Sequence, residues 1–263
     1  MSIALALLLG LVQGITEFLP ISSSGHLRLI SAAFGVQGAQ TLFDVCVHSG
    51  TLVAVLAYYR NEVWSMIASL ANPSWDNPRF RLSVLVIVGT IPAAVIGIGF
   101  GELMEGDLAT VPAVGGFLLL NGVILMQARG DTGEGRSIDE LTLMDAILVG
   151  SAQCIALFRG VSRSGTTIVA ALKRGISREA AATFSFLLSI PVIGGAVILE
   201  VGKALSEGGV SATPLVAGTL VAGVSGYAAL VLLVRLVKNG HLHRFAWYCW
   251  AVGAFALAAS FLT

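Results

Sequence analysis

The feature that most constrains the fold is a series of windows of about 20 residues that carry almost no charge. Such windows are long and apolar enough to cross a bilayer as helices. Only 11% of the residues are charged, whereas about 25% is usual in a soluble domain. The chain is therefore expected to be an all-α integral membrane protein, and its net charge of +0 gives no electrostatic reason for a nucleic-acid partner. The candidate spans are Phe43–Tyr59, Leu82–Phe100, Val111–Ala128, Ala180–Val201, Pro214–Leu236 and Phe245–Leu262.

Two polar stretches interrupt this apolar pattern, QGITEFLPISSSGH at 13–26 and QCIALFRGVSRSGT at 153–166. The first apolar segment enters the bilayer, breaks at Pro20 and a serine-rich loop, and turns back. This pattern predicts a re-entrant helical hairpin from Ile3 to Phe34, and a second one from about Leu141 to Lys173. Irregular backbone at this depth is tolerated only where it is buried in protein or lines a water-filled cavity.

The two polar stretches are copies of one another at an offset of 140 residues, with seven identities in the sixteen positions from Gly10 to Gly25. We interpret them as two halves of one polar site in a single membrane domain over residues 1–263. Repeat one covers about 1–128 and repeat two about 141–263, and the charged link 129–140 joins them. The identical pairs are Gly10 and Gly150, Gln13 and Gln153, Ile15 and Ile155, Phe18 and Phe158, Ser22 and Ser162, Ser24 and Ser164, and Gly25 and Gly165.

Each repeat contains three full spans, an odd number, so the second repeat must be inverted in the membrane relative to the first. The sequence thus predicts an inverted-repeat bundle of about six transmembrane helices plus two re-entrant hairpins, an architecture best known in transporters. Lysines and arginines gather in the segments 60–81, 129–140, 173–179 and 235–244. Because cytoplasmic loops are enriched in these residues, we expect the four segments in the cytoplasm, both termini outside, the first hairpin opening outward and the second inward.

Gln13 and Glu17 are four residues apart and therefore share one face of the first helix. A carboxylate at this depth costs roughly 2.5–3.5 kcal/mol and needs a partner or a task. Together with the amide of Gln13, its oxygens suit Mg²⁺ or Ca²⁺ better than zinc. The alternative is that Glu17 only caps the hairpin or pairs with an arginine.

Ser22, Ser23, Ser24 and Gly25 stand just before a short helix, whose free N–H groups and dipole favour an anion. N-capping by one of these serines is the simpler interpretation, but it does not explain all three. His26 follows Ser23 by three residues, close enough to act as base or acid to a hydroxyl. A purely structural histidine is the alternative.

The second loop places Arg163 between Ser162 and Ser164, followed by Gly165 and Thr166. A guanidinium binds phosphate oxygens through two parallel hydrogen bonds. The alternative to phosphate binding by Arg163 is a salt bridge to Glu17. An anion cradle, a cation, an arginine clamp and a hydroxyl–imidazole pair are what phosphoryl transfer requires. The residues predict a membrane-embedded site for a phosphate-bearing substrate, and they leave open whether the phosphate is cleaved or carried.

The motifs TEFLPISSSGH (16–26), SRSGTT (162–167) and ISREAAATFSFLLSIPVIGGA (176–196) resemble the undecaprenyl-diphosphate phosphatase family, also called the bacitracin-resistance family. The likeness runs nearly end to end. It implies a bacterial inner-membrane hydrolase with paired inverted repeats, acting on a polyprenyl diphosphate lipid. Such an enzyme removes the terminal phosphate of undecaprenyl diphosphate, yields the monophosphate carrier for peptidoglycan synthesis, and opens to the periplasmic side.

The resemblance also implies roles for individual residues. Gln13 and Glu17 are implied to hold a divalent cation or to orient the histidine. Ser23 is implied to be the nucleophile or a phosphate ligand, His26 its base, and Arg163 the phosphate clamp. Phosphate contacts are expected from the flanking Ser22, Ser24, Gly25, Ser162, Ser164, Gly165 and Thr166.

Three positions depart from the family pattern. Gln13 is the less common choice and weakens the metal site by one charge. Arg159 replaces the usual proline and either touches phosphate or pairs locally. His48 replaces the usual glutamine, and with Asp44 it either extends the polar site or lies at the membrane interface.

Two other classes of function are alternatives to a phosphatase. The same inverted repeats would suit a transporter that flips a polyprenyl phosphate or moves a small anion, although transport needs no serine–histidine pair. A structural membrane scaffold would leave Glu17, His26 and Arg163 unexplained. The sequence does not decide whether the chain forms a homodimer.

Overall fold

The computed structural model describes residues 1–35, 41–207 and 211–261, with their side chains except those at 102, 104, 105, 107 and 203–207. Within these ranges the regular structure is helical, apart from one isolated bridge between Arg136 and Ile176. The α-helices are α1 (Ile3–Phe18), α2 (Ser23–Ala33), α3 (Thr41–Tyr58), α4 (Arg60–Ser69), α5 (Pro78–Glu105), α6 (Val111–Met126), α7 (Leu143–Gln153), α8 (Arg163–Lys173), α9 (Arg178–Glu207), α10 (Ala212–Lys238) and α11 (Phe245–Ser260). Short 3₁₀ turns lie at Asp107–Ala109, Ile138–Glu140, Cys154–Leu157 and Leu242–Arg244.

Among the described residues, 4 helices are long and apolar enough to cross a membrane, over Thr41–Tyr58, Pro78–Gly101, Arg178–Gly202 and Ala212–Lys238. They coincide with four of the predicted spans. The other two predicted spans form α6 and α11, apolar helices of 16 residues each; the last residues of the span Phe245–Leu262 lie outside the described part. The prediction of an all-α, multi-pass membrane protein is confirmed.

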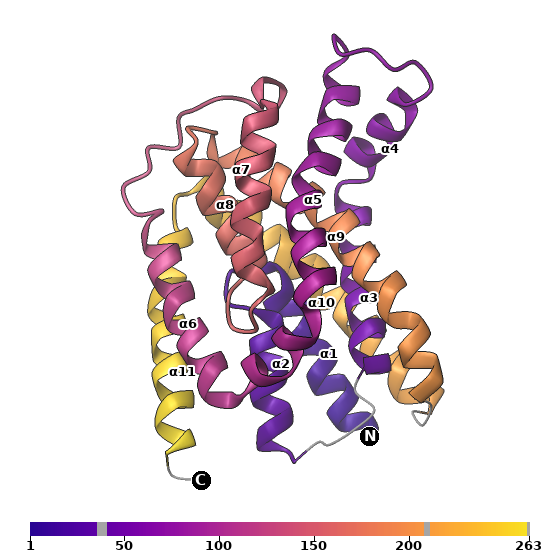
Figure 1. Cartoon of the computed structure of the whole chain (residues 1–263), viewed down its shortest axis with the longest axis vertical. Helices are drawn as coiled ribbons and strands as arrows, with labels where there is room; N and C mark the ends of the chain where they lie inside the picture. Colours follow the sequence, from indigo (N-terminus) through magenta and orange to yellow (C-terminus); the bar gives the residue numbers. More distant parts are fainter. Residues whose placement is uncertain (36–40, 208–210, 262–263) are drawn as a thin grey trace.

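Helix α4 is an element that the hydropathy pattern does not predict, because the segment 60–81 reads as a polar loop. The helix is short and lies at the end of the molecule farthest from both termini (Figure 1). Its apolar side chains Trp64 and Ile67 are 71% and 54% exposed. Exposed apolar side chains on a short helix beside polar ones are typical of a segment at a membrane interface.

The two re-entrant hairpins approach one another from opposite ends of the molecule, as Figure 1 shows. The first consists of α1 and α2, and the second of α7 and α8, with the turn Cys154–Leu157 between them. Both termini lie at the end from which the first hairpin enters. The break after Phe18 and the break after Leu157 therefore meet in the interior, where side chains of both halves can form one site.

Corresponding helices of the two halves pack against each other. Helix α3 packs on α9, and α6 packs on α11. The hairpins are exchanged between the halves, because α1 lies along α10 and α7 lies along α5. The first helix of each hairpin therefore packs on a long helix of the other half.

Equivalent glycines allow the close approach of each hairpin to its long helix. A Cβ added at Gly10 would lie 2.4 Å from the carbonyl oxygen of Gly218, and one added at Gly150 would lie 2.1 Å from that of Gly89. Only glycine permits backbones to come this near. The pairing of Gly10 with Gly150 in the repeat alignment thus has a packing cause.

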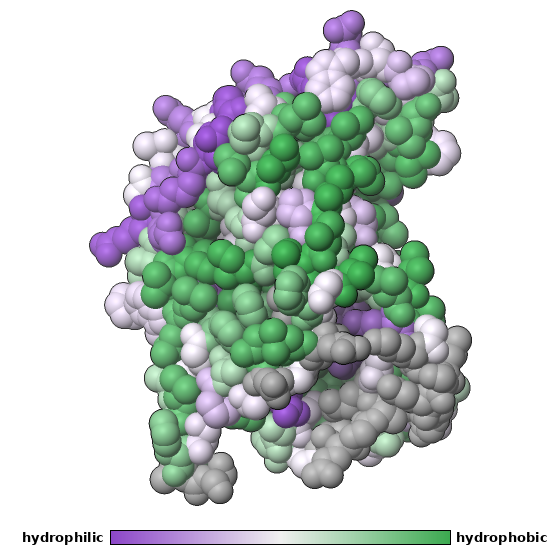
Figure 2. Space-filling view, in the orientation of Figure 1, coloured by the Kyte–Doolittle hydropathy of each residue, from purple (hydrophilic) through white to green (hydrophobic). Residues whose placement is uncertain are grey.

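Hydrophilic residues gather at the end of the molecule that carries α4 and the link 129–140, whereas apolar residues dominate its middle (Figure 2). The buried carboxylate of Asp145 accepts hydrogen bonds from Arg136 at 2.6 and 2.9 Å and from Arg174 at 2.9 Å. In the link, the backbone N–H of Ser137 donates to Glu140 and lowers the pKa of that carboxyl. The pair of Arg136 with Asp145 attaches the link to the second hairpin.

Candidate active site

The tips of the two hairpins are joined through Ser22. This residue has a positive φ of 71°, unusual for a residue with a side chain. Its Oγ accepts hydrogen bonds from the backbone N–H of Gly25 at 3.3 Å and from that of Gly160, in the other hairpin, at 3.0 Å. In return, the Ser164 hydroxyl of the second hairpin donates to the carbonyl oxygen of Phe18 at 2.9 Å.

Asn121 is a further bridging residue, which the sequence reasoning missed. It is fully buried on α6, and its amide nitrogen donates to the Pro20 carbonyl oxygen at 2.9 Å. Its amide oxygen accepts from the backbone N–H of Ser162 at 2.9 Å. One asparagine thus holds both tips, and the available signal was a lone amide inside the uncharged segment 111–126.

Glu17 is the centre of the polar cluster between the tips. Its Oε1 accepts from Nη2 of Arg163 at 2.9 Å, and its Oε2 accepts from Oγ of Ser23 at 2.6 Å and from Nε2 of Gln13 at 3.2 Å. The Glu17 and Arg163 side chains are only 8% and 12% exposed. A carboxylate at this depth is therefore neutralised by one arginine and also holds the candidate nucleophile.

His48 approaches the same carboxylate from α3. Its Nδ1 lies 2.7 Å from the Asp44 carbonyl oxygen, and its Nε2 lies 3.9 Å from Glu17 Oε2. Beside it, the Gln153 side chain is buried, and neither of its amide atoms has a hydrogen-bond partner among the described residues. A buried amide without a partner indicates a position that water or a ligand fills.

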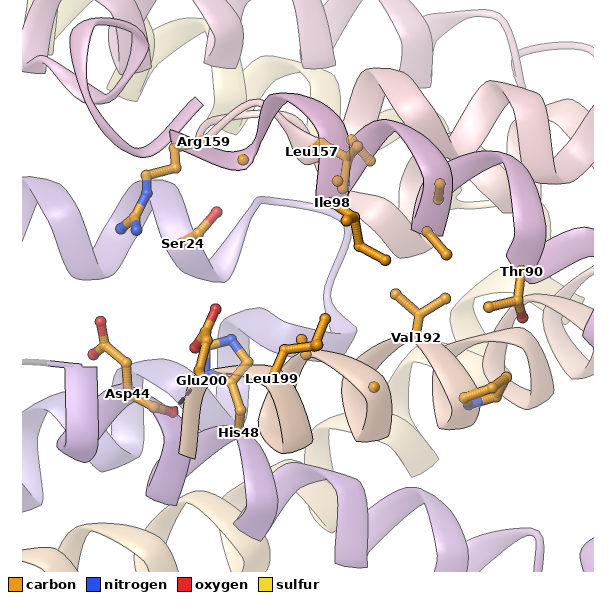
Figure 3. A pocket seen from close by; sticks show the side chains of 18 of the residues that line it. Ser24, Asp44, His48, Thr90, Ile98, Leu157, Arg159, Val192, Leu199 and Glu200 are labelled. Carbon is orange, nitrogen blue, oxygen red and sulfur yellow. Dashed lines mark hydrogen bonds between the residues drawn. The ribbon is translucent and has the colours of Figure 1, made fainter. Parts of the chain in front are cut away.

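These side chains line a cleft with two adjoining chambers. The inner chamber, of about 190 Å³, is lined by Glu17, Ser23, Gln153 and Arg163 together with apolar residues of α3 and α9. The outer chamber, of about 400 Å³, is lined mainly by apolar residues of α5 and α9. Ser24, His48 and Glu200 line both chambers. Figure 3 shows the outer chamber, with most of its polar side chains at one end and mainly apolar ones along the rest.

The structure brings part of the predicted site together. Glu17, Ser22, Ser23, Ser24, Ser162 and Arg163 all line the inner chamber. The remaining predicted residues of the loops, which lie behind the chamber wall, are Gln13, Gly25, His26, Ser164, Gly165 and Thr166.

Several of the predicted loop residues have structural roles. Ser22 and Ser162 cap α2 and α8 by accepting from the backbone N–H groups of Gly25 and Gly165. N-capping, the simpler interpretation of the serines, is therefore seen for one serine of each loop. Thr166 is buried, and its hydroxyl has no partner among the described residues.

The structure does not bring His26 together with Ser23. One ring nitrogen of His26 lies 2.8 Å from the Ser22 carbonyl oxygen, and the other lies 2.8 Å from the hydroxyl of Tyr248. The two rings are also stacked, with centroids 5.6 Å apart. His26 lines a different cavity, of about 670 Å³, between α1, α10 and α11. The predicted hydroxyl–imidazole pair is not formed in this geometry, and the catalytic role of His26 stays a prediction.

A divalent cation fits the residues around Glu17 poorly. The described residues contain no group of three or more histidine, cysteine, aspartate or glutamate side chains placed to hold a metal ion. Both oxygens of Glu17 already accept hydrogen bonds, and Arg163 balances its charge. Gln13 turns its nitrogen to Glu17, and its oxygen is buried without a partner. The protein therefore offers one free oxygen here, and Mg²⁺ or Ca²⁺ would need its other oxygen ligands from water or from a bound phosphate.

Comparison with known proteins gives consistent matches over nearly the whole chain. The family model described as "Bacitracin resistance protein BacA" matches residues 6–255. The undecaprenyl-diphosphatase of Carboxydothermus hydrogenoformans is 40% identical over 252 residues, which is 94% of each chain. Undecaprenyl-diphosphatase 3 of Bacillus cereus is 42% identical over 261 residues, 97% of this chain and 96% of the relative. The undecaprenyl-diphosphatase of Desulfatibacillum aliphaticivorans is 39% identical over 269 residues, 97% of this chain and 98% of the relative.

Proposed function

Because the chain belongs to the BacA family of bacitracin resistance proteins, we propose that it is a membrane-embedded phosphatase that hydrolyses undecaprenyl diphosphate. Its products are undecaprenyl phosphate, the lipid carrier of peptidoglycan synthesis, and inorganic phosphate. We place it in the bacterial inner membrane with both termini outside. The proposal covers one chain, and a homodimer is not needed for it, because both halves of the site come from the same chain.

The observation that carries the chemistry is the 2.6 Å hydrogen bond from the Ser23 hydroxyl to Glu17, at the inner end of a cleft with an apolar outer chamber. In the proposed reaction Ser23 Oγ attacks the terminal phosphorus while its proton passes to Glu17. The bond between that phosphorus and the bridging oxygen breaks, and undecaprenyl phosphate leaves with the bridging oxygen. Water then attacks the phosphoserine, inorganic phosphate departs, and the proton on Glu17 returns to the serine oxygen.

Arg163 supplies the positive charge. In the free protein it bonds Glu17, and it faces the inner chamber with little exposure. A phosphate that enters the chamber offers the guanidinium two oxygens in place of one, so the arginine can turn toward the substrate without becoming unpaired. The phosphate charge is then neutralised where the bond breaks, and Glu17 is left to take the serine proton.

We propose that a divalent cation, where the reaction needs one, is bound mainly by oxygens of the diphosphate. Such a cation would neutralise phosphate charge, and the donors nearest to it on the protein would be Glu17 and Gln13. Purified protein without lipid should then show no stoichiometric Mg²⁺ or Ca²⁺ binding by calorimetry, and should bind the ion once a non-hydrolysable diphosphate lipid is added. Tight binding by the protein alone would contradict this.

The experiment that tests the function is phosphate release from undecaprenyl diphosphate by protein purified in detergent, with and without chelator. We expect release by the wild type, a loss of at least about 100-fold for Ser23→Ala, and a phosphorylated intermediate that acid quenching traps only when Ser23 is present. Release without a trapped intermediate would indicate direct attack by water. A protein that moves polyprenyl phosphate between the faces of a vesicle but releases no phosphate in detergent would be a transporter instead.

A further inference from the structure

We propose that Arg159 forms a second phosphate subsite in the outer chamber, which binds the phosphate that stays on the lipid. The subsite rests on the proposed function, because it assumes a lipid diphosphate in the cleft. Its ligand class is a phosphate monoester or the lipid-side phosphate of a diphosphate. Arg163 would bind the terminal phosphate and Arg159 the lipid-side phosphate. Because each arginine would bind one phosphate group, the protein would favour diphosphates over monophosphates.

The turn at the tip of the second hairpin fixes the two arginines relative to each other. Gly160 lies between them with a φ of 118°, and a Cβ there would lie 2.6 Å from the Val114 carbonyl oxygen. Its N–H is held by Ser22 of the other hairpin. The turn therefore cannot shift without breaking the contact between the hairpins, and it directs Arg163 to the inner chamber and Arg159 to the outer one.

The two arginines differ in how they are bonded in the free protein. Arg163 is paired with Glu17, whereas the described residues give Arg159 no hydrogen bond and no ion pair. Arg159 is half-buried, and Figure 3 shows it beside Ser24 at the polar end of the outer chamber. A half-buried guanidinium that no side chain or carbonyl occupies is well suited to an anionic ligand.

The order of surfaces along the cleft assigns each phosphate to one chamber. Beyond Arg159 and Ser24 the outer chamber is lined by Ile98, Leu157 and Leu199 (Figure 3). A prenyl chain would lie against this apolar wall. Its attached phosphate would then come first to Arg159, and the terminal phosphate would reach Ser23 and Arg163 in the inner chamber.

Two carboxylates in the outer chamber increase the need for a positive charge at Arg159 when a phosphate binds. Asp44 and Glu200 lie across the chamber from it, as Figure 3 shows. Both would repel a phosphate that enters this space. Arg159, on the opposite side of the chamber, supplies positive charge that offsets this repulsion, so its removal would delete an attraction while the repulsion remains.

The test uses the two reaction products as separate probes of the two subsites, with full-length protein in detergent. Undecaprenyl phosphate reports on the outer chamber and inorganic phosphate on the inner one. For Arg159→Ala we expect KM for undecaprenyl diphosphate and Ki for undecaprenyl phosphate to rise about tenfold or more, with Ki for inorganic phosphate unchanged and kcat within about threefold. Arg159→Lys should fall between the wild type and Arg159→Ala.

Matched variants separate the subsite from general effects. Arg244→Ala removes an exposed arginine in the loop between α10 and α11 and should change none of these constants. If Arg159→Ala leaves Ki for undecaprenyl phosphate unchanged, or raises both Ki values equally, the subsite is refuted. If the alanine variant does not fold, Arg159→Lys and Arg159→Gln decide by the same comparison.

The two proposals fail in different ways. Wild-type protein that releases no phosphate would refute the function, and the affinity for undecaprenyl phosphate, measured by calorimetry on wild type and Arg159→Ala, would still decide on the subsite. A tenfold loss of that affinity supports the subsite even then. Equal affinities of the wild type and Arg159→Ala for undecaprenyl phosphate would refute the subsite, and they would not affect the proposal that the protein is a phosphatase.

Discussion

At the scale of single residues, the site depends on how one buried carboxylate is shared. Glu17 bonds Arg163, Ser23 and Gln13 at once, and His48 lies 3.9 Å away. A buried ion pair contributes little to stability, but removal of one member leaves the other charge uncompensated. The same arrangement is useful for phosphoryl transfer, since an incoming phosphate can replace the carboxylate as the partner of Arg163.

Glu17→Gln keeps the shape of the side chain but removes its charge. We expect the rate of phosphate release to fall about 100-fold or more, because the serine loses its proton acceptor. The melting temperature in detergent should also fall, because Arg163 keeps its charge without a counterion. Release at the wild-type rate would contradict the assignment of Glu17. Glu179→Gln, which breaks an exposed pair with Lys238, is the matched control and should change neither quantity noticeably.

Substitution of His26 tests whether this residue positions the first hairpin tip or transfers a proton in the reaction. Its ring bonds the Ser22 carbonyl and the Tyr248 hydroxyl, so we expect His26→Ala to loosen the first hairpin tip. The melting temperature should fall while kcat drops less than about tenfold, and Tyr248→Phe should show a smaller change of the same kind. A loss of kcat as large as that of Ser23→Ala, with an unchanged melting temperature, would support His26 as the base instead.

At the scale of helices, the close contacts of the hairpins set the position of the site. The first helix of each hairpin is pressed against a long helix of the other half through Gly10 and Gly150. The two contacts lie about two helical turns before the breaks that carry the polar loops. A change of helix spacing here would displace Ser23 and Arg163 relative to each other.

Gly150→Ala should therefore be costly although it adds a single methyl group. The added Cβ would lie 2.1 Å from the Gly89 carbonyl oxygen, so we expect a loss of about 1–3 kcal/mol in stability and a lower melting temperature. Gly99→Ala is the matched control, because a Cβ at Gly99 meets nothing within 4 Å, and it should be neutral or slightly stabilising. Equal effects of the two changes would contradict the packing argument.

At the scale of the whole molecule, the asymmetry of its two ends bears on orientation. The end with α4 and the link 129–140 is hydrophilic, and both termini lie at the other end. Three of the lysine- and arginine-rich segments are 60–81, 129–140 and 173–179, and they follow or precede helices that reach this polar end. Charged cytoplasmic loops are the common arrangement in membrane proteins.

The predicted orientation can be measured with a membrane-impermeant maleimide on intact cells. A cysteine introduced at Asp76, in the segment between α4 and α5, should react only after the cells are permeabilised. One introduced at Ser2 should react in intact cells. The unaltered chain gives the background from its native Cys46, Cys154 and Cys249. The opposite pattern of labelling would reverse the assigned orientation.

The sequence was sufficient to predict the spans and the hairpins, because hydropathy and an offset of 140 point to them. It offered the salt bridge of Arg163 with Glu17 only as an alternative to phosphate binding. It could not predict which way His26 faces. Spacing along a helix shows which residues share a face, but the partner of that face is Tyr248, 222 residues away. Asn121 was missed for the same reason, since its partners Pro20, Ser162 and Cys249 are all distant in sequence.

The exchange of hairpins between the halves has a consequence for biosynthesis. A ribosome that has made only the first 128 residues has delivered Glu17 and Ser23 to the membrane, but neither Arg163 nor α10, on which α1 packs. The nascent chain at this stage has no catalytic activity, and the glycine-lined surface of α1 is not yet covered by α10. Catalytic competence therefore arrives late in translation, and a chain truncated before α10 should be a substrate for membrane quality-control proteases rather than a weaker enzyme.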